Sequence, residues 1–441
     1  MNTKELRQSA RLIWEAALNA ANPGTCVRKS LQSRNKVLIA GGKPIEIGGR
    51  LMVIGAGKAS ARMAQVVEEI LGSHITGGLI VTKYGHALPL QRLRLVEAAH
   101  PIPDSAGVRA VSDTRELLRG LHKDDIVLVL ISGGGSALWP APAAGITLEE
   151  KQEVTSLLLR AGATIQELNA VRKHLSDIKG GQLARWASPA RVISLIMSDV
   201  IGDPIDFIAS GPTAPDTTSF SHALAIIQKY GVHVPEAVKE RFQQGARGDI
   251  PETPKPGDAV FKDVDNYVIA NNRLLVDAAA GKARELHFNT LLLGTEVEGE
   301  AKDIGRFFAA IARETAGTGN PVQPPACILA AGETTVTVRG QGTGGRNQEM
   351  TLAWAISIAS RPFASHSCFA SVATDGTDGP TSAAGGLVDP FTCSRAVELG
   401  LIPQKFLSSN DSSNFLKATG DLIITGPTHT NLMDLQILLV G

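Results

Sequence analysis

Lys58 is the first residue of this sequence whose type and position could do chemistry. It ends a glycine-rich turn, in the order Gly-Ala-Gly-Lys-Ala-Ser over residues 55–60. The apolar run before this turn is typical of a buried strand, and the residues after it are typical of a helix. Free backbone amides at the start of a helix, together with one ammonium group, favour an anion such as phosphate. We therefore predict an anion-binding loop in which Lys58 supplies the charge.

The same loop does not match the two nucleotide-binding patterns that it partly resembles. A dinucleotide-binding loop has a third glycine where Ser60 stands here, and Lys83 replaces the acid that would bind the ribose of NAD. A loop of the G-x-x-x-x-G-K-[ST] type needs glycine at the position of Met52 and a hydroxyl residue at that of Ala59. The sequence thus argues against NAD, whereas Lys83 leaves NADP open.

Two further glycine-rich loops follow predicted strands. Residues 132–137 read SGGGSA, and residues 342–349 read GTGGRNQE, with Arg346 at the start of a predicted helix. Successive amides can form a nest for phosphate, and a guanidinium group binds phosphate or carboxylate oxygens in a bidentate manner. The alternatives are a tight turn in the first loop and a structural pair between Arg346 and Glu349 in the second. The predicted phosphate- or nucleotide-binding residues are Gly55, Gly57, Ser132, Gly133, Gly134, Gly135, Ser136, Gly344 and Gly345.

Carboxylates also stand at the ends of predicted strands. Asp199, Glu333 and Asp375 each follow an apolar run. Acids at the carboxyl ends of parallel strands face the ligand crevice, and Mg²⁺ usually takes one or two carboxylates in addition to phosphate oxygens and waters. We predict these three acids as Mg²⁺ ligands, Asp199 as an alternative proton acceptor, and His100 and Asp378 as residues of the substrate cleft. Any of the acids could instead cap a helix or an Asx turn.

Strand-like and helix-like segments alternate along the chain, which predicts an α/β fold with a mostly parallel, doubly wound sheet. The first 22 residues form an amphipathic helix with its apolar positions on one face. A segment rich in proline and glycine at 245–261 suggests a boundary between domains at 1–250 and 251–441. We leave open whether the last strand packs back on the first domain. The predicted strands are 36–42, 51–57, 77–83, 93–99, 125–132, 191–199, 265–271, 290–294, 327–333, 334–340, 368–376, 421–426 and 434–441.

Composition excludes several classes of protein. The 441 residues include 43 basic and 43 acidic side chains, and only 4% are aromatic. A neutral chain with few rings has no electrostatic footprint for nucleic acid. No apolar run reaches the roughly 18 residues needed to span a bilayer. Four scattered cysteines indicate neither a disulfide framework nor a zinc site, which favours a cytoplasmic location. A homo-oligomer remains open.

The set of loops, taken in order, resembles the bacterial type 2 glycerate kinases, whose C-terminal part is the MOFRL domain. The matching motifs are GAGKAS, EAAHPIPD, ISGGGSAL, NAVRKHLSDIKGG, SDVIGDP, IASGPTAPD, AAGETTVTV, GTGGRNQE, ATDGTDGPTSAAGG and TGPTHTN. The resemblance implies a Rossmann-like N-terminal domain, a smaller α/β C-terminal domain and an active site in the cleft between them. It implies transfer of the γ-phosphate of ATP to the 2-hydroxyl of D-glycerate, giving 2-phosphoglycerate.

Three residues take roles from this resemblance. Lys58 and Arg346 fall on the lysine and arginine of the family motifs, which are taken as catalytic or substrate-binding, and Asp199 matches a family acid near the same cleft. The sequence departs from the pattern at His429, where glycine is usual, and at Ser382, where an acid is usual.

Two other functions remain as alternatives. One is an NADP-dependent reductase of hydroxypyruvate or tartronate semialdehyde, which the strand–glycine–helix pattern and Lys83 keep open. The other is a non-catalytic protein that binds an organic acid. The sequence does not decide which hydroxyl of glycerate accepts phosphate.

Overall fold

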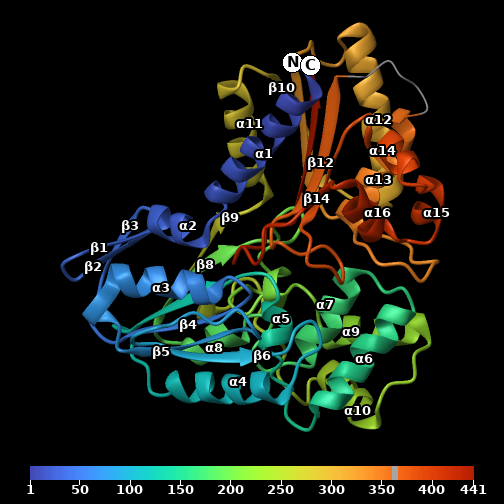
Figure 1. Cartoon of the computed structure of the whole chain (residues 1–441). Helices are drawn as coiled ribbons and strands as arrows, with labels where there is room; N and C mark the ends of the chain where they lie inside the picture. Colours follow the sequence, from blue (N-terminus) through green and yellow to red (C-terminus); the bar gives the residue numbers. More distant parts are fainter. Residues whose placement is uncertain (360–365) are drawn as a thin grey trace. The chain divides into compact units, whose positions relative to one another are not determined.

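The computed structural model describes residues 1–359 and 366–441. The chain divides into two compact units (Figure 1). The N-terminal unit is Pro23–Ile269, and the C-terminal unit combines Met1–Asn22 with Ala270–Gly441. Two features therefore differ from the predicted ranges of 1–250 and 251–441. The first helix belongs to the C-terminal unit. Residues 251–269, which contain most of the last strand of the first sheet, belong to the N-terminal unit.

The N-terminal unit is built on a six-stranded sheet in the order β6-β5-β4-β7-β8-β9. The pairs from β6 to β8 are parallel, as predicted, and β4, β7 and most of β5 and β8 are buried along their length because both faces of the sheet are covered. The chain runs outward from β4 through β5 to β6 and then returns to place β7 on the other side of β4. The strands are β4 (Leu51–Ala56), β5 (Gly77–Lys83), β6 (Arg94–Ala98), β7 (Ile126–Ile131), β8 (Arg191–Met197) and β9 (Val264–Ala270).

Helices cover both faces of this sheet, which confirms the doubly wound fold. Alternate strand residues, such as Ile54 and Val129, share a core with α4 (Ser105–Leu117) and α8 (Gln182–Ala187). Helix α3 (Ser60–Leu71) packs against β4, β5 and β7, and Figure 1 shows it on the side of the sheet opposite α4. Short helices connect these elements: α5 (Gly135–Leu138), η1 (Gly72–His74), η2 (Ile208–Ser210) and η3 (Ala259–Phe261).

Two smaller parts complete the N-terminal unit. Four helices share a core of their own: α6 (Leu148–Arg160), α7 (Ile165–His174), α9 (Phe220–Tyr230) and α10 (Glu236–Arg247). Helix α2 (Pro23–Ser30) leads into an antiparallel three-stranded sheet of β1 (Leu31–Arg34), β2 (Val37–Ala40) and β3 (Lys43–Glu46). The sequence predicted one strand over 36–42 and missed its two partners, because each has only four residues and a weak apolar alternation.

The C-terminal unit contains a mixed six-stranded sheet in the order β10-β11-β15-β12-β13-β14. The terminal strand lies in the centre of this sheet, antiparallel to both β11 and β12, so it does not join the first sheet. Only β10 and β11 are parallel. The strands are β10 (Asn289–Val297), β11 (Ala326–Gly332), β12 (Ser367–Ala373), β13 (Gly385–Val388), β14 (Leu422–Ile423) and β15 (Asp434–Val440).

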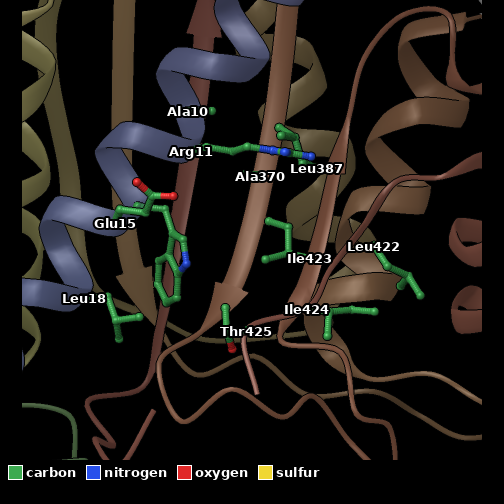
Figure 2. A pocket seen from close by; sticks show the side chains of 11 residues that line it. Ala10, Arg11, Glu15, Leu18, Ala370, Leu387, Leu422, Ile423, Ile424 and Thr425 are labelled. Carbon is green, nitrogen blue, oxygen red and sulfur yellow. The ribbon is translucent and has the colours of Figure 1, made fainter. Parts of the chain in front are cut away.

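Two pairs of helices cover the two faces of this second sheet. Helix α1 (Thr3–Ala20) packs against α11 (Asn272–Glu285), β12 and β15, and its predicted apolar face is buried as expected. Phe369 of β12 packs on the other face, in the core of α12 (Ala301–Thr318) and α13 (Arg346–Ala359). Its neighbour Ala370 lines a cavity of about 530 Å³ between α1 and β13–β14, into which Arg11 extends (Figure 2). The remaining helices are α14 (Thr392–Glu398), α15 (Pro403–Ser408) and α16 (Ser412–Thr419).

The strand predicted over 334–340 is wrong, because this segment forms only one isolated bridge. Side chains satisfy its amides in place of a neighbouring strand. The Thr337 amide donates to Glu300 Oε1 at 3.0 Å, and the amides of Arg339 and Gly340 donate to Asn410 Oδ1 at 2.7 and 2.9 Å. These acceptors come from residues beside the ends of two helices, α12 and α15. The alternating pattern TTVTV thus marks an extended segment without a sheet.

Candidate functional site

Two loops meet at the carboxyl ends of β4 and β7, where the strand order of the first sheet reverses. Ligands bind at this switch point in open α/β sheets. The Lys58 amide donates to Gly133 O at 2.9 Å, and the Ala59 amide donates to Ser132 Oγ at 3.0 Å. Hydrogen bonds therefore join two of the predicted loops to each other. Ser60 Oγ also lies 3.3 Å from Ser132 Oγ.

The same contacts change which amides can bind an anion. The amides of Gly57, Lys58 and Ala59 all donate to protein oxygens, so the first loop does not offer them to phosphate. The free amides predicted at the start of this helix are therefore not available in the first loop. Over the residues that the structure describes, the amides of Gly133 and Gly134 have no acceptor. The capacity for anion binding thus lies in the second loop.

Gly55 and Gly57 serve close packing in place of ligand contact. Gly55 lies within β4 and not in the loop, and a Cβ there would overlap the Leu130 carbonyl of β7. A Cβ on Gly57 would overlap both Ser132 Oγ and the Ser132 carbonyl, and the φ of Gly57 is +147°. These glycines let the two loops approach each other closely.

Lys58 and His100 flank the exposed end of the second loop. A Cβ on Gly134 would lie 3.0 Å from His100 Cδ2 and 3.5 Å from Lys58 Cγ, and the φ of Gly134 is +86°. His100 follows β6, so residues after three strands converge on one glycine. Asp199 comes two residues after the end of β8 and is half-buried at the same edge of the sheet. The predictions for Lys58, His100, Gly134 and Asp199 therefore fall on one edge.

A cavity of about 720 Å³ opens from this edge, and His100, Gly134 and Ser136 line it. Four cations that the sequence did not single out also line it: Lys151 and Arg160 of α6, Arg172 of α7, and Lys179 just before α8. Lys179 is 1% exposed and Lys151 is 5% exposed. Lys179 Nζ donates to Ser136 O at 2.7 Å and to Ser136 Oγ at 3.0 Å, while Lys151 Nζ donates to the Pro140 carbonyl. We call Lys151, Arg172 and Lys179 the basic cluster.

The basic cluster lacks the carboxylates that stabilise its neighbours in the chain. Lys173 lies next to Arg172 and donates to Asp206 at 3.1 Å and to Asp216 at 3.3 Å. By contrast, no member of the basic cluster forms an ion pair within the described residues. Burial, and after it the charge of Arg172, lower the pKa of Lys151 to about 7. Burial likewise holds the pKa of Lys179 well below its usual value.

Arg346 belongs to the C-terminal unit, at the start of α13. Its Nε and Nη2 donate to the two carboxylate oxygens of Asp434 at 2.5 and 3.0 Å, and its Nη1 donates to Glu333 Oε1 at 2.7 Å. Burial alone would lower the pKa of Arg346, but the hydrogen bonds and charge of Asp434 and the charge of Glu333 raise it above its usual value. The predicted alternative of a structural pair between Arg346 and a carboxylate is therefore observed, but Glu349 is not the partner, because it accepts from Asn410 at 2.9 Å. Asp434, fully buried between β11 and β12, is the partner that the sequence missed.

Asp378 takes the position predicted for phosphate in the third loop. Its carboxylate accepts from the amides of Asn347 and Gln348 at 3.2 and 2.9 Å and is 2% exposed. A Cβ on Gly345 would overlap this carboxylate, and one on Gly344 would overlap Ser412 Oγ. Asp378 is therefore the cap of α13, and neither the phosphate nest at Gly344 and Gly345 nor a cleft role for Asp378 fits this arrangement. Burial and then the charge of Asp434 raise the pKa of Asp378 to about 6.

The three predicted Mg²⁺ ligands fall in different units. Asp199 is in the N-terminal unit, whereas Glu333 and Asp375 are in the C-terminal unit. Glu333 binds Arg346, and Asp375 Oδ1 accepts from the amide and hydroxyl of Thr377 at 3.0 Å, as in an Asx turn. Groups of three potential ligands are absent from the described residues. A single carboxylate with phosphate oxygens and waters is the kind of site that remains open.

Two family models match the chain. The first, described as a domain of unknown function (DUF4147), matches residues 9–243, and the MOFRL family matches residues 326–434. The glycerate 2-kinase of Pyrococcus horikoshii is 41% identical over 433 residues, which cover 98% of this chain and 96% of that protein. The chain belongs to the glycerate 2-kinase family.

Other relatives also match over nearly the full length of the chain, and one of them carries a different name. The D-glycerate 2-kinase of Thermotoga maritima is 40% identical over 438 residues, or 99% of both chains. A crystal structure of glycerate kinase from the same organism matches with a TM-score of 0.88 at 39% identity, covering 99% of this chain and 100% of that one. A protein of Agrobacterium vitis, provisionally named hydroxypyruvate reductase, is 41% identical and covers all of this chain and 96% of its own length.

The departure from the glycerate 2-kinase pattern at His429 has a local consequence. His429 has a φ of +58°, in the left-handed region that favours glycine. A non-glycine residue in this region costs about 1 kcal/mol or more. Ser382 lies on the surface of a turn, and nothing in the structure explains the loss of an acid there.

The close approach of the two switch-point loops gives a first prediction for this glycerate 2-kinase relative. Gly57→Ala adds a Cβ that overlaps Ser132 and should lower the free energy of unfolding by about 2 kcal/mol or more. Gly231→Ala is the matched control, since Gly231 has a left-handed backbone conformation but an added Cβ there would meet nothing within 4 Å. It should cost about 1 kcal/mol, from backbone strain alone. Urea unfolding measures both, and equal losses would show that the loop contact is unimportant.

Proposed function

We propose that this chain transfers the γ-phosphate of ATP to the 2-hydroxyl of D-glycerate, giving 2-phosphoglycerate and ADP. Similarity to glycerate 2-kinases over nearly the full length supports the reaction. The observation that carries it furthest is local. Lys58, His100 and the unsatisfied amides of Gly133 and Gly134 converge at the switch point of the first sheet. This is a set of cationic and N–H groups that suits transfer of a phosphoryl group.

Each of these groups has a role in the proposal. Phosphoryl transfer depends on positioning and on stabilising negative charge, with little need of covalent help from the protein. Lys58 and the amides of Gly133 and Gly134 stabilise charge on the transferring group. His100, beside Gly134, contacts the substrate. Arg346 stabilises charge on the phosphoryl group or on the glycerate carboxylate. A site between the domains stays a prediction.

Mg²⁺ is part of the proposal, and Asp199 is its best-placed ligand. Asp199 is half-buried at the sheet edge that carries Lys58, whereas Glu333 is held by Arg346 and Asp375 by Thr377. When bound, Mg²⁺ neutralises charge on the ATP phosphates. The alternative role of Asp199 is to accept the proton of the attacking hydroxyl.

A reductase is the second candidate, because the Agrobacterium vitis relative carries that name and Lys83 ends β5. The loop contacts argue against it. A dinucleotide pyrophosphate binds to free amides at the first glycine loop, and here those amides donate to Gly133, Ser132 and Val81. Lys83 therefore would be present, but the backbone amides that normally bind the pyrophosphate of a dinucleotide would not be available.

Two assays on the purified chain decide among the candidates. Incubation with D-glycerate and Mg-ATP should give ADP and one phosphorylated product, which phosphorus NMR identifies as 2- or 3-phosphoglycerate. Incubation with hydroxypyruvate and NADPH should leave the absorbance of NADPH unchanged. Rapid oxidation of NADPH, with no ADP formed in the first assay, would replace the kinase by the reductase. Binding of D-glycerate without turnover in either assay would favour the non-catalytic protein.

A further inference from the structure

The basic cluster places three cations in one cavity, and within the described residues no carboxylate forms an ion pair with any of them. Lys151 and Lys179 are almost completely buried, and they donate hydrogen bonds to the neutral oxygens of Pro140 and Ser136. Buried cations are normally paired, because an uncompensated charge away from water is costly. Arg172 faces both lysines and disfavours their charged forms. The unliganded chain thus keeps an electrostatically unfavourable cluster.

We propose that this cavity binds the polyphosphate of the nucleotide donor, with Lys151, Arg172 and Lys179 as its ligands. The inference rests on the proposed function and deepens it by naming where the donor binds. Gly134 and Ser136 line this cavity, so the cavity includes the unsatisfied amide of Gly134 in the switch-point loop. A chain of phosphates lying along the basic cluster would therefore reach the groups assigned to phosphoryl transfer.

Size and charge favour a polyphosphate over the small acid. The cavity of about 720 Å³ falls in the range typical of sites for ligands much larger than a three-carbon acid. A single carboxylate carries one negative charge, whereas a polyphosphate carries several and can match three cations. Apolar side chains at the outer part, including Ile102 and Leu159, offer a surface for a nucleobase.

Proton uptake should accompany binding. Lys151 faces Arg172 of α7, Arg241 of α10, Asp177 and Lys179, while Glu149, Glu153 and His100 line the same cavity. With a pKa of about 7 in the unliganded chain, Lys151 is largely neutral at pH 8.5 and largely protonated at pH 6. An anion raises this pKa, so binding above pH 7 takes up a proton and weakens as the pH rises.

Calorimetry on the full chain tests the proposal, with tripolyphosphate and a non-hydrolysable ATP analogue as probes. Lys179→Met and Arg172→Met should each raise the dissociation constant of both probes about 30-fold or more, since each removes a buried charge partner. Lys239→Met is the matched control, because Lys239 is exposed on α10 and pairs only with Glu236. It should bind both probes as the wild type does. D-glycerate, titrated separately, should be affected little by any of the three substitutions.

The pH dependence supplies a second, independent measurement. For the wild type, affinity for the ATP analogue should fall about tenfold from pH 6.5 to 8.5, and Lys151→Met should flatten this profile. Circular dichroism and thermal unfolding show whether each variant is folded. Folding should survive, because Met removes an unfavourable buried charge and Ser176 Oγ still reaches the Pro140 carbonyl at 3.5 Å.

Unchanged affinity for both probes in Lys179→Met and Arg172→Met would overturn the proposal, and so would a loss confined to D-glycerate. These results are distinguishable from failure of the proposed function. A wild type that phosphorylates D-glycerate while the variants bind ATP normally keeps the kinase and removes this pocket. If the wild type binds the polyphosphate through the basic cluster but never phosphorylates D-glycerate, the pocket is kept and the proposed kinase function is removed.

Discussion

Lys58→Ala should lower the turnover of D-glycerate phosphorylation by on the order of 10³-fold while leaving the chain folded. The ammonium group of Lys58 is proposed to stabilise charge on the transferring phosphoryl group, and alanine cannot replace it. The contact that fixes the loop comes from the backbone amide of residue 58, which alanine retains. We therefore expect a change in the free energy of unfolding of less than about 1 kcal/mol. A coupled assay for ADP measures turnover, and urea unfolding measures stability.

Lys83→Ala is the matched control for this experiment. Lys83 is also a half-buried lysine at the carboxyl end of a strand, but it ends β5 and has no proposed role in phosphoryl transfer. Its substitution should leave turnover within about twofold of the wild type, as expected for a residue away from the reacting groups. Turnover near normal in Lys58→Ala would remove the role assigned to this lysine. Loss of NADPH-dependent activity in Lys83→Ala would instead support the reductase.

Local patterns in the sequence predicted most of the elements of the two large sheets and the sheet edge at which several candidate residues lie. The apolar run at 77–83 predicted β5 with its observed bounds, and the spacing of Leu6, Ala10, Ile13 and Ala17 predicted the buried face of α1. Both are properties of a few successive residues. Strand-end residues such as Lys58 and Asp199 fell on one edge of the first sheet because parallel strands share a direction.

Long-range partners explain what the sequence did not predict. Asp378 occupies the helix start where phosphate was expected, and it lies 31 residues from Asn347, whose amide it accepts. Lys179 becomes a site candidate only because folding places it against Ser136, 43 residues away. Asp434 looks like the first residue of an apolar strand, and nothing near it in the sequence signals Arg346. Which donor meets which acceptor is decided by the topology.

A double-mutant cycle with Asp434 can separate the structural pairing of Arg346 from its proposed role in catalysis. Arg346→Met leaves Asp434 fully buried without its bidentate partner, so the free energy of unfolding should fall by about 3–5 kcal/mol. Asp434→Asn should cost less, because Arg346 is 30% exposed and keeps its contact with Glu333. The double variant Arg346→Met, Asp434→Asn removes the buried charge and should recover most of the stability lost in Arg346→Met.

Turnover of D-glycerate phosphorylation should depend on the presence of Arg346 and not on that of Asp434. If the guanidinium group contacts the phosphoryl group or the glycerate carboxylate, Arg346→Met and the double variant should both lose about 10²–10³-fold in turnover, whether or not the chain is stable. Asp434→Asn keeps the guanidinium group and should retain turnover within about tenfold, a shift worth about 1.4 kcal/mol of transition-state stabilisation. Recovery of turnover together with stability in the double variant would contradict the catalytic role. Arg346 would then serve only to neutralise Asp434 at the centre of the second sheet.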